Sequence, residues 1–590
     1  MPSSAISLLT RSVTPPDSTD STVVGIVSSP ETESFPRQRV EFLNGSAPAQ
    51  LQRYPQTTGP WTGYPLRQND PMLIDTPSPS SNGSALSPSS SNAERSSRRL
   101  GPLSIEGRRN ANQVRDIGAC LRCSCMKEKC DRNLPCGNCH DKKGRKWKLG
   151  CVRETLEYRG KHLFPPPIAN RYNIDHTNRY VDSSGFFYLN KDAFQLKLSM
   201  GLGGPPFEVT VKEMEPVEHQ RLLRSFQADT KDEDLKVSSF WDPPIVLYLT
   251  NKDQAVDDLR SQLHRSMHAI FNERHENGYH WPWKNFDFQR MDWVSEIVEK
   301  IHDFGQHASQ MSFYSSLRKA QGLLYFNYIL DHPLLVLEEE REKLFAHLEP
   351  QEGVEHKYVS PETIQRFIKA IAYPFLTNWS TAILKELHEL LLSMAKAKEI
   401  SSAKNDLAFC LSFMMLVFIG QTQARLVLLA QMSEEEKGIN MTQSEAQEYI
   451  EALEEQLGTY IIHFHEFAMK KRRKPQAPSG DPRKPEEQYA AQYGLMGKIA
   501  EITQKFRAYY SLSYPYHQAS FARQNTTKIP RKTKNRTTKL VKDETETLWP
   551  ADDWKPTTFD LGELDYAEFE KENIHRLCWK FVDAIIVWSE

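Results

Sequence analysis

The sequence predicts a mainly α-helical protein that carries a small cysteine-rich module and a long disordered N-terminal arm. Three observations predict this class. Seven of the nine cysteines in the 590 residues fall between Cys120 and Cys151. Apolar residues recur at helical spacing over much of the chain beyond residue 254. The residues before the module are rich in Ser, Thr, Pro and Asn and hold few apolar clusters, so they cannot bury enough surface to offset chain entropy.

The expected organisation follows these changes in composition. We expect four regions in order: a disordered Ser/Thr/Pro-rich arm at 1–114, the cysteine module at 115–160, a linker and mixed connecting region at 161–254, and a large α-helical domain at 255–590. In the connecting region the apolar runs FFYL, FEVTV and PIVLYL predict short strands, because Gly- and Pro-rich turns bound them. We expect this region to pack on the helical domain.

The helical domain contains three clear apolar segments. One periodic segment runs from Met291 to Phe304 and another from Thr377 to Ala397. The most apolar run, 407–420, has fourteen residues, fewer than the ~20 needed to cross a bilayer, which predicts a buried central helix. A further stripe predicts a helix that packs into the core rather than a coiled-coil dimer; it comprises Ile450, Leu453, Leu457, Tyr460, Phe464 and Phe467.

The cysteines of the module have the spacing of metal ligands. Disulfides would need an oxidising compartment. A secretory signal consists of a charged segment followed by an apolar one, and the N-terminal residues contain no such pattern. Zinc is therefore favoured, and with it a location in the cytosol or nucleus. Two Cys-x2-Cys pairs alone would hold one zinc, and a third cysteine follows each pair. Six thiolates can complete the coordination of two tetrahedral zinc ions if two of the sulfurs bridge both ions. The six candidate ligands are Cys120, Cys123, Cys130, Cys136, Cys139 and Cys151.

The segment ACLRCSCMKEKCDRNLPCGNC closely resembles the fungal-type binuclear zinc cluster (Zn(2)-C6), the DNA-binding domain of many fungal transcription regulators. The resemblance covers about residues 116–155. It implies two zinc ions per chain, bridging thiolates at Cys120 and Cys136, and a first short helix that presents its end to a CGG-like triplet in the major groove. The sequence departs from the family pattern in the eleven residues between Cys139 and Cys151, in the seventh cysteine Cys125, and in Ser124, where a basic residue is common. Cys125 and His140 are further possible ligands.

The charge distribution points to a polyanion as partner. The whole chain is nearly neutral, with 74 basic and 76 acidic residues, whereas Arg95 to Lys161 holds eighteen Lys/Arg against seven Asp/Glu. Such a basic footprint on a neutral protein is typical of nucleic-acid binding. By resemblance Lys127 occupies one base-reaching position and Met126 the other. Arg122, Lys129 and Arg132 are candidates for phosphate contacts. The long loop holds a basic run that we expect to follow the DNA backbone or to serve nuclear import: Lys142, Lys143, Arg145, Lys146 and Lys148. Any of these residues could equally be a solvated loop charge.

Two segments of the helical domain carry further hypotheses. Five consecutive basic residues form a possible nuclear localisation signal: Lys470, Lys471, Arg472, Arg473 and Lys474. Acidic residues alternate with aromatic and apolar ones at 543–572, which is the composition of activation segments that bind coactivators; a surface strip on the helical domain is the alternative. Homodimerisation is left open, because the linker shows no sustained heptad and Pro165–Pro167 would end a helix.

Together these observations predict a sequence-specific, double-stranded-DNA-binding transcription regulator of the RNA polymerase II type that acts in the nucleus with a coactivator or corepressor. The alternative is a single-zinc RNA- or protein-interaction module with a non-specific basic surface, which would use Cys120, Cys123, Cys136 and Cys139. An enzyme is not expected, since no nucleophile elbow, phosphate loop or His-Glu zinc motif appears. His463 and His465 are two residues apart and diverge on a helix. No membrane partner is expected.

Overall fold

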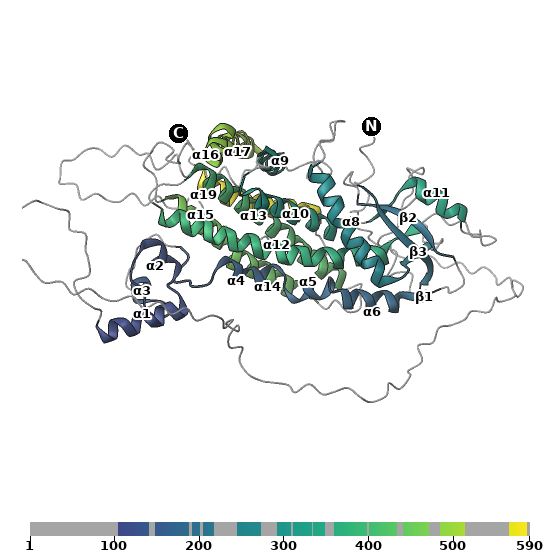
Figure 1. The fold of residues 1–590 in the computed structure, drawn as a ribbon, viewed down its shortest axis with the longest axis horizontal. Coiled ribbons are helices and arrows are strands. Elements are labelled where there is room, and N and C mark those ends of the chain that lie inside the picture. The colour runs from purple at the N-terminus through teal and green to yellow at the C-terminus, as the bar shows by residue number, and fades with distance from the viewer. Residues whose placement is uncertain are drawn as a thin grey trace, which may run out of the picture. The chain divides into compact units, whose positions relative to one another are not determined.

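Helices make up most of the chain that the computed structural model describes (Figure 1). The described residues are 104–140, 148–187, 192–200, 205–216, 245–272, 292–307, 311–332, 334–347, 359–397, 401–433, 441–470, 484–513 and 566–586. The α-helices are α1 (Ile105–Ile117), α2 (Leu121–Met126), α3 (Gly137–His140), α4 (Leu156–Arg159), α5 (Pro166–Arg171), α6 (Ile174–Ser184), α8 (Lys252–Asn272), α9 (Asp292–His307), α10 (Tyr314–Asp331), α11 (Glu338–His347), α12 (Glu362–Lys396), α13 (Ser402–Ser433), α14 (Gln443–Leu453), α15 (Thr459–Lys470), α16 (Pro485–Tyr493), α17 (Leu495–Ser513) and α19 (Tyr566–Ile585). A 3₁₀ turn, η1 (Gly160–Leu163), and a π-helical turn, η5 (Glu454–Gly458), complete the helical elements.

The most apolar helix, α13, lies at the centre of the core. It packs against α10, α12, α14, α16 and α19. By length and composition it could cross a membrane, but its apolar stretch is completely buried inside the protein. The expected buried helix is therefore present, although the predicted fourteen residues were too few for its 32. The helix continues past Gly420 because its polar side chains are buried with partners. Gln421 accepts a hydrogen bond from Asn327 (2.8 Å), and Gln423 donates one to the carbonyl of Ile450 (3.0 Å).

Arg425 on the same helix is buried in an ion pair. Its Nε donates to one carboxylate oxygen of Asp331 and its Nη2 to the other, both at 2.8 Å. Nη2 also donates to the side chain of Asn327 at 2.5 Å. Because an unpaired buried guanidinium would be strongly destabilising, this pair fixes how α10 lies against α13.

A small sheet packs on the helices through β3 and β4. The strands are β1 (Gly185–Phe187), β2 (Phe194–Ser199), β3 (Phe207–Pro216), β4 (Ile245–Leu249), β5 (Leu335–Val336) and β6 (Val359–Ser360). Their order is β5-β2-β3-β4-β6, with β1 also paired to β3, and only the β4–β6 pair is parallel. Helix α8 contacts β3, and α12 contacts β4. The three expected strands correspond to β1, β3 and β4, whereas β2 was not predicted, although Phe194, Leu196 and Leu198 alternate with polar residues as in a half-buried strand.

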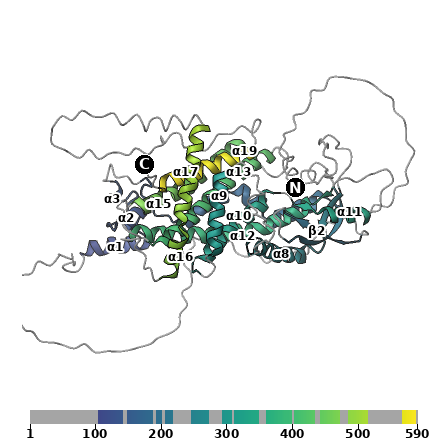
Figure 2. The ribbon, with the colours of Figure 1, turned by 90° about the horizontal axis from the view of Figure 1, so that it is seen from above.

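The apolar stripe from Ile450 to Phe467 forms α14, η5 and α15 in direct succession; Figure 2 shows α15 from a second direction. Five of its six residues are buried in the core, and Phe467 is half-buried, so the core-packing interpretation holds. The first residue of the π turn, Glu454, is buried and accepts hydrogen bonds from Arg576 and Lys580 of α19. The C-terminal helix therefore fixes the π turn.

The structure adds a helix where the sequence predicts only disorder. Helix α1 occupies Ile105–Ile117, although the disordered arm was expected to extend to residue 114. The rest of the arm lies outside the described residues, as does most of the acidic segment at 543–572. The last residues of that segment, from Tyr566, open α19, where Phe569 is buried.

We expect Gly420→Ala to destabilise the protein, because α13 and α19 approach closely there. A Cβ at Gly420 would lie 2.6 Å from Cγ1 and 3.2 Å from Cα of Ile574, and overpacking of this kind costs about 1–3 kcal/mol. The matched control is Gly497→Ala in α17, where a Cβ would meet nothing within 4 Å. Urea unfolding of the full chain should show a lower midpoint for Gly420→Ala only. Equal midpoints would contradict the close packing of α13 on α19.

Candidate metal centre

Two similar turns bring the cysteines together. In the first, Cys120 is the N-cap of α2 and its sulfur accepts a hydrogen bond from the backbone N–H of Cys123 (3.5 Å). Helix α2 ends at Lys127, which adopts the left-handed conformation (φ 54°) and donates its N–H back into the helix. In the second turn, the backbone N–H groups of Cys139 and His140 bond to the carbonyl of Cys136 at 2.8 and 2.9 Å. Each Cys-x2-Cys pair thus occupies the first turn of a short helix.

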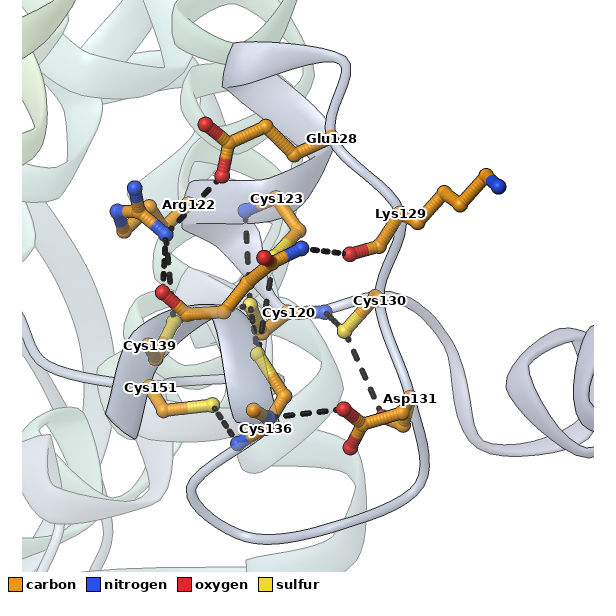
Figure 3. Close-up of polar contacts among 12 residues, drawn as sticks. Cys120, Arg122, Cys123, Glu128, Lys129, Cys130, Asp131, Cys136, Cys139 and Cys151 are labelled. Atoms are coloured by element: carbon orange, nitrogen blue, oxygen red, sulfur yellow. Dashed lines mark hydrogen bonds and ion pairs between the residues drawn. The ribbon is translucent and has the colours of Figure 1, made fainter. Parts of the chain in front are cut away.

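The third cysteine of each half makes the same contact. The backbone N–H of Cys120 donates to the sulfur of Cys130 at 3.4 Å, and the backbone N–H of Cys136 donates to the sulfur of Cys151 at 3.2 Å (Figure 3). Each contact joins the first cysteine of one half to the third cysteine of the same half. The two halves that the sequence spacing suggests are therefore repeated in the geometry, in spite of the long segment between Cys139 and Cys151.

The sulfurs lie at the separation that a shared metal would require. Cys120 Sγ is 3.8 Å from Cys136 Sγ and 3.7 Å from Cys139 Sγ, and Cys123 Sγ is 3.7 Å from Cys136 Sγ. Tetrahedral zinc with Zn–S bonds of about 2.3 Å separates its sulfurs by about 3.8 Å. Ligand atoms of Cys120, Cys123, Cys136 and Cys139 all lie within 4.8 Å of one another. This arrangement is compatible with zinc binding.

Burial changes the acidity of these thiols. Burial raises the pKa of Cys123 to about 12 and that of Cys151 to about 11. For Cys136 burial acts in the same direction, but hydrogen bonds from Cys139, Cys123 and Cys120 outweigh it and lower its pKa to about 7. A metal that takes up these sulfurs must therefore displace protons from most of them.

Arg122 lies inside the module and not on its surface. Its side chain is buried, with Nη1 3.1 Å from the carbonyl of Asn138, 3.9 Å from Cys139 Sγ and 3.3 Å from the carboxylate of Glu128. These contacts join the two halves of the module. Only 3% of Arg122 is exposed, so its guanidinium does not lie at the surface, where the expected phosphate contact would need it.

The other basic residues of the motif face outward. Lys127, Lys129 and Arg132 are exposed, and Figure 3 shows the Lys129 side chain directed away from the cysteines. Met126, at the other base-reaching position, is 40% exposed. Of the basic run in the long loop, Lys142, Lys143, Arg145 and Lys146 lie outside the described residues, whereas Lys148 lies 3.6 Å from the carboxylate of Glu466. Lys471 to Lys474 and the side chain of Lys470 also lie outside the described residues.

The seventh cysteine and the histidine lie apart from the sulfur group. Cys125 is completely buried, but among the apolar residues of the helical body. His140 ends α3 and is exposed. Neither belongs to the group of four sulfurs that could hold a metal.

Sequence reasoning missed two residues that hold the module together. Arg153 donates to the carbonyls of Gly118 (2.6 Å), Asp131 (2.5 Å) and Asn133 (2.9 Å). The carboxylate of Asp131 accepts from the N–H groups of Asn133 and Gly137, both at 2.8 Å. Asp131 stands directly after Cys130, a position typical of the zinc-cluster family, but no spacing signals Arg153.

The histidines considered for catalysis do not form a site. His465 is completely buried, and burial lowers its pKa to about 3; its Nδ1 lies 2.9 Å from Ser412 Oγ, which is buried as well. His463 contacts Glu466 at 3.3 Å on another face of α15. The two histidines diverge, as their spacing predicts.

The comparisons with known proteins place the chain among fungal transcription factors. The chain belongs to the KpeA transcription factor family, whose family model matches residues 170–477, from α5 to just beyond α15. It is 30% identical over 118 residues to the transcription factor kpeA of Aspergillus oryzae, and 36% identical over 113 residues to the satratoxin biosynthesis SC3 cluster transcription factor SAT20 of Stachybotrys chartarum. These alignments cover 20% and 19% of this chain and 15% and 14% of the relatives. No solved structure matches it.

We expect Arg153→Ala to weaken metal retention although Arg153 is no ligand. The change removes the donor of three carbonyls, one before α2 and two in the loop after Cys130, and hydrogen bonds to charged groups contribute about 1.5–3 kcal/mol each. Zinc transfer from the full chain to a chromogenic chelator should become at least about tenfold faster. Arg132→Ala, which removes an exposed arginine of the same module, should leave the transfer rate unchanged. Equal rates for both variants would contradict the bracing role of Arg153.

Proposed function

We propose that the protein is a DNA-binding transcription regulator that reads CGG-like sites in the major groove with a two-zinc, six-cysteine cluster. The observation that carries this proposal is the repeated N–H···S contact of Cys120 with Cys130 and of Cys136 with Cys151. Family membership supports a regulator that acts in the nucleus and has no enzymatic activity. Because the alignments span only about a seventh of the named relatives, their activities enter here as support for a proposal.

The sulfur contacts favour bridging by Cys120 and Cys136. Each of the three sulfur contacts at 3.7–3.8 Å described above includes one of these two residues. Each half then supplies one first cysteine shared by both metals, one second cysteine, and one third cysteine that a backbone N–H holds. Zinc would supply the folding energy that so short a segment lacks, and a shell filled with thiolates leaves no position for a catalytic water.

The exposed lysines and arginine support DNA as the partner. Lys127 stands at the end of α2 and is exposed, so its ammonium can donate to the O6 and N7 acceptors of guanine. Lys129 and Arg132 are also exposed and suit phosphate contacts, which set the position of a protein on the duplex. The basic residues between His140 and Lys148 extend the same footprint in sequence. Arg122 is not part of this proposal.

The second candidate is a module with a single zinc that binds RNA or protein through a non-specific basic surface. The group of four sulfurs from Cys120, Cys123, Cys136 and Cys139 favours it, because those four alone could complete one tetrahedron. It leaves Cys130 and Cys151 without a role as ligands.

Three further proposals concern the helical body. The basic run from Lys470 to Lys474 serves as a nuclear localisation signal. The acidic and aromatic residues at 543–572 contact a coactivator or corepressor. If two copies associate, a surface of the helical body joins them.

Zinc stoichiometry separates the two candidates. We expect two zinc ions per full-length chain, and about one or fewer in Cys130→Ser and in Cys151→Ser, because each change removes a ligand. Cys125→Ser is the matched control and should retain two. The measurement is elemental analysis of the purified chain against its concentration. One zinc per chain, unchanged in Cys130→Ser, would favour the single-zinc module.

Selection of DNA sequences and the salt dependence of binding test the residues proposed to contact bases and phosphates. We expect random duplex DNA selected by the full chain to be enriched in CGG. On such a site Lys127→Ala should cost about 1–3 kcal/mol and relax the preference for guanine. Lys129→Ala should weaken all sequences alike and lower the slope of affinity against salt by about one.

Selection without enrichment, or equal affinity for duplex DNA and RNA of one sequence, would contradict sequence-specific regulation. If Lys127→Ala left the preference for guanine unchanged, a residue other than Lys127 would have to contact the bases. Both experiments use zinc-loaded protein, so that loss of the fold is not mistaken for loss of contact.

A further inference from the structure

Helix α2 has two occupied faces. Cys123 lies among the sulfurs, whereas Leu121 and Cys125 are buried in the hydrophobic core of the helical body. Residues four apart share one face of a helix, so Leu121 and Cys125 together form an apolar contact surface. This surface packs against α12. The cysteine module therefore contributes side chains to the same core as the helices of the body.

The linker after the module is also bound to the body. Arg159, in α4, lies with its guanidinium 4.7 Å from the centre of the Tyr460 ring. Its Nη1 donates to the carbonyl (3.0 Å) and to Oε1 (2.8 Å) of Gln456, and its Nη2 lies 2.9 Å from the carboxylate of Glu154. Tyr460 in turn donates its hydroxyl to the carbonyl of Glu154 (3.4 Å). Arg159 thus joins the linker to the π turn η5 and to α15.

Two further contacts lie on either side of Arg159. Before it in sequence, Lys148 Nζ is 3.6 Å from the carboxylate of Glu466 on α15. After it, the chain approaches α12 so closely that a Cβ at Gly160 would lie 2.8 Å from Cδ1 of Leu384. The module and its linker consequently contact the body over α12, η5 and α15.

We propose that the cysteine module is a fixed part of the helical body and that Arg159 is its positioning residue. Leu121 and Cys125 seat α2 on α12, and Arg159 holds the linker on the π turn. In this arrangement Lys127, Lys129 and Arg132 remain exposed. The docking does not depend on the function proposed above. Its consequence, that the body lies on one defined side of bound DNA, rests on that function.

The docked linker is not available to form a coiled coil between two chains. Residues 156–163 form α4 and η1 and pack against α12, α14 and η5. The same residues cannot simultaneously form a coiled coil between two copies. Association of two chains, where it occurs, then uses another surface.

Zero-length cross-linking of the full chain tests the docking directly. A carbodiimide joins an amine to a carboxylate only in contact, so without DNA we expect a cross-link between Lys148 and Glu466, identified by mass spectrometry of the digested protein. Arg159→Ala changes neither cross-linked residue. It should lower the yield about tenfold, the change expected when hydrogen bonds to a charged group are lost. Arg159→Lys, which keeps the charge without the planar fork, should give an intermediate yield.

Lys161→Ala is the matched control, because Lys161 is exposed in the same linker and lies over the Tyr158 ring instead. Its cross-link yield should equal that of the unaltered chain. Cys125→Gln tests the apolar contact of α2 with the helical body. It should also lower the cross-link yield while the zinc content stays unchanged. Circular dichroism confirms that the helical body of each variant is intact.

An absent cross-link in the unaltered chain, or equal yields for the unaltered chain and for folded Arg159→Ala and Cys125→Gln, would overturn the docking. Sequence-specific DNA binding without the cross-link would overturn the docking alone. A cross-link that depends on Arg159, in a chain that shows no preference for any duplex sequence, supports the docking and contradicts only the proposed function.

Discussion

Burial of the polar segment of α13 sets the positions of its neighbours. A buried polar group without a partner costs about 1–3 kcal/mol, and α13 carries several such groups in succession. Gln423 is satisfied by the Ile450 carbonyl of α14 and by Asn573 of α19, and Arg425 by Asp331 of α10. Each partner comes from a different helix, so the helices must meet at this segment. Apolar packing makes the body stable, and these bonds select one arrangement of it.

The same logic extends from the C-terminal helix to the cysteine module. Glu454 opens the π turn and is buried; burial alone would raise its pKa, but the hydrogen bonds and charges of Arg576 and Lys580 lower it. A carboxylate held charged in this way cannot move without leaving buried cations unpaired. Two residues along the chain, Gln456 accepts the hydrogen bonds of Arg159. The π turn is therefore fixed by α19 and contacts the linker of the module.

Local patterns in the sequence predicted local structure well. The cysteine spacing predicted two matching halves, and the stripe from Ile450 to Phe467 predicted a helix on the core. The prediction failed where distant residues decide the outcome. The length of α13 depends on partners nearly a hundred residues away. The inward position of the Arg122 side chain depends on its contacts with Asn138 and Glu128. Arg153 and Arg159 carry no periodicity or motif, because their partners are carbonyls and an aromatic ring that only the fold brings near.

The contacts of the arginines also change the meaning of the basic footprint. Summed over the sequence, every Lys and Arg between Arg95 and Lys161 counts equally toward attraction of a polyanion. In the structure Arg122, Arg153 and Arg159 direct part of their guanidinium groups toward carbonyls, a sulfur and carboxylates within the protein. A guanidinium held in this way still contributes to the long-range potential, but it has fewer N–H groups left for a phosphate than an exposed side chain has. The number of counterions released on DNA binding should therefore follow the exposed residues and not the charge sum.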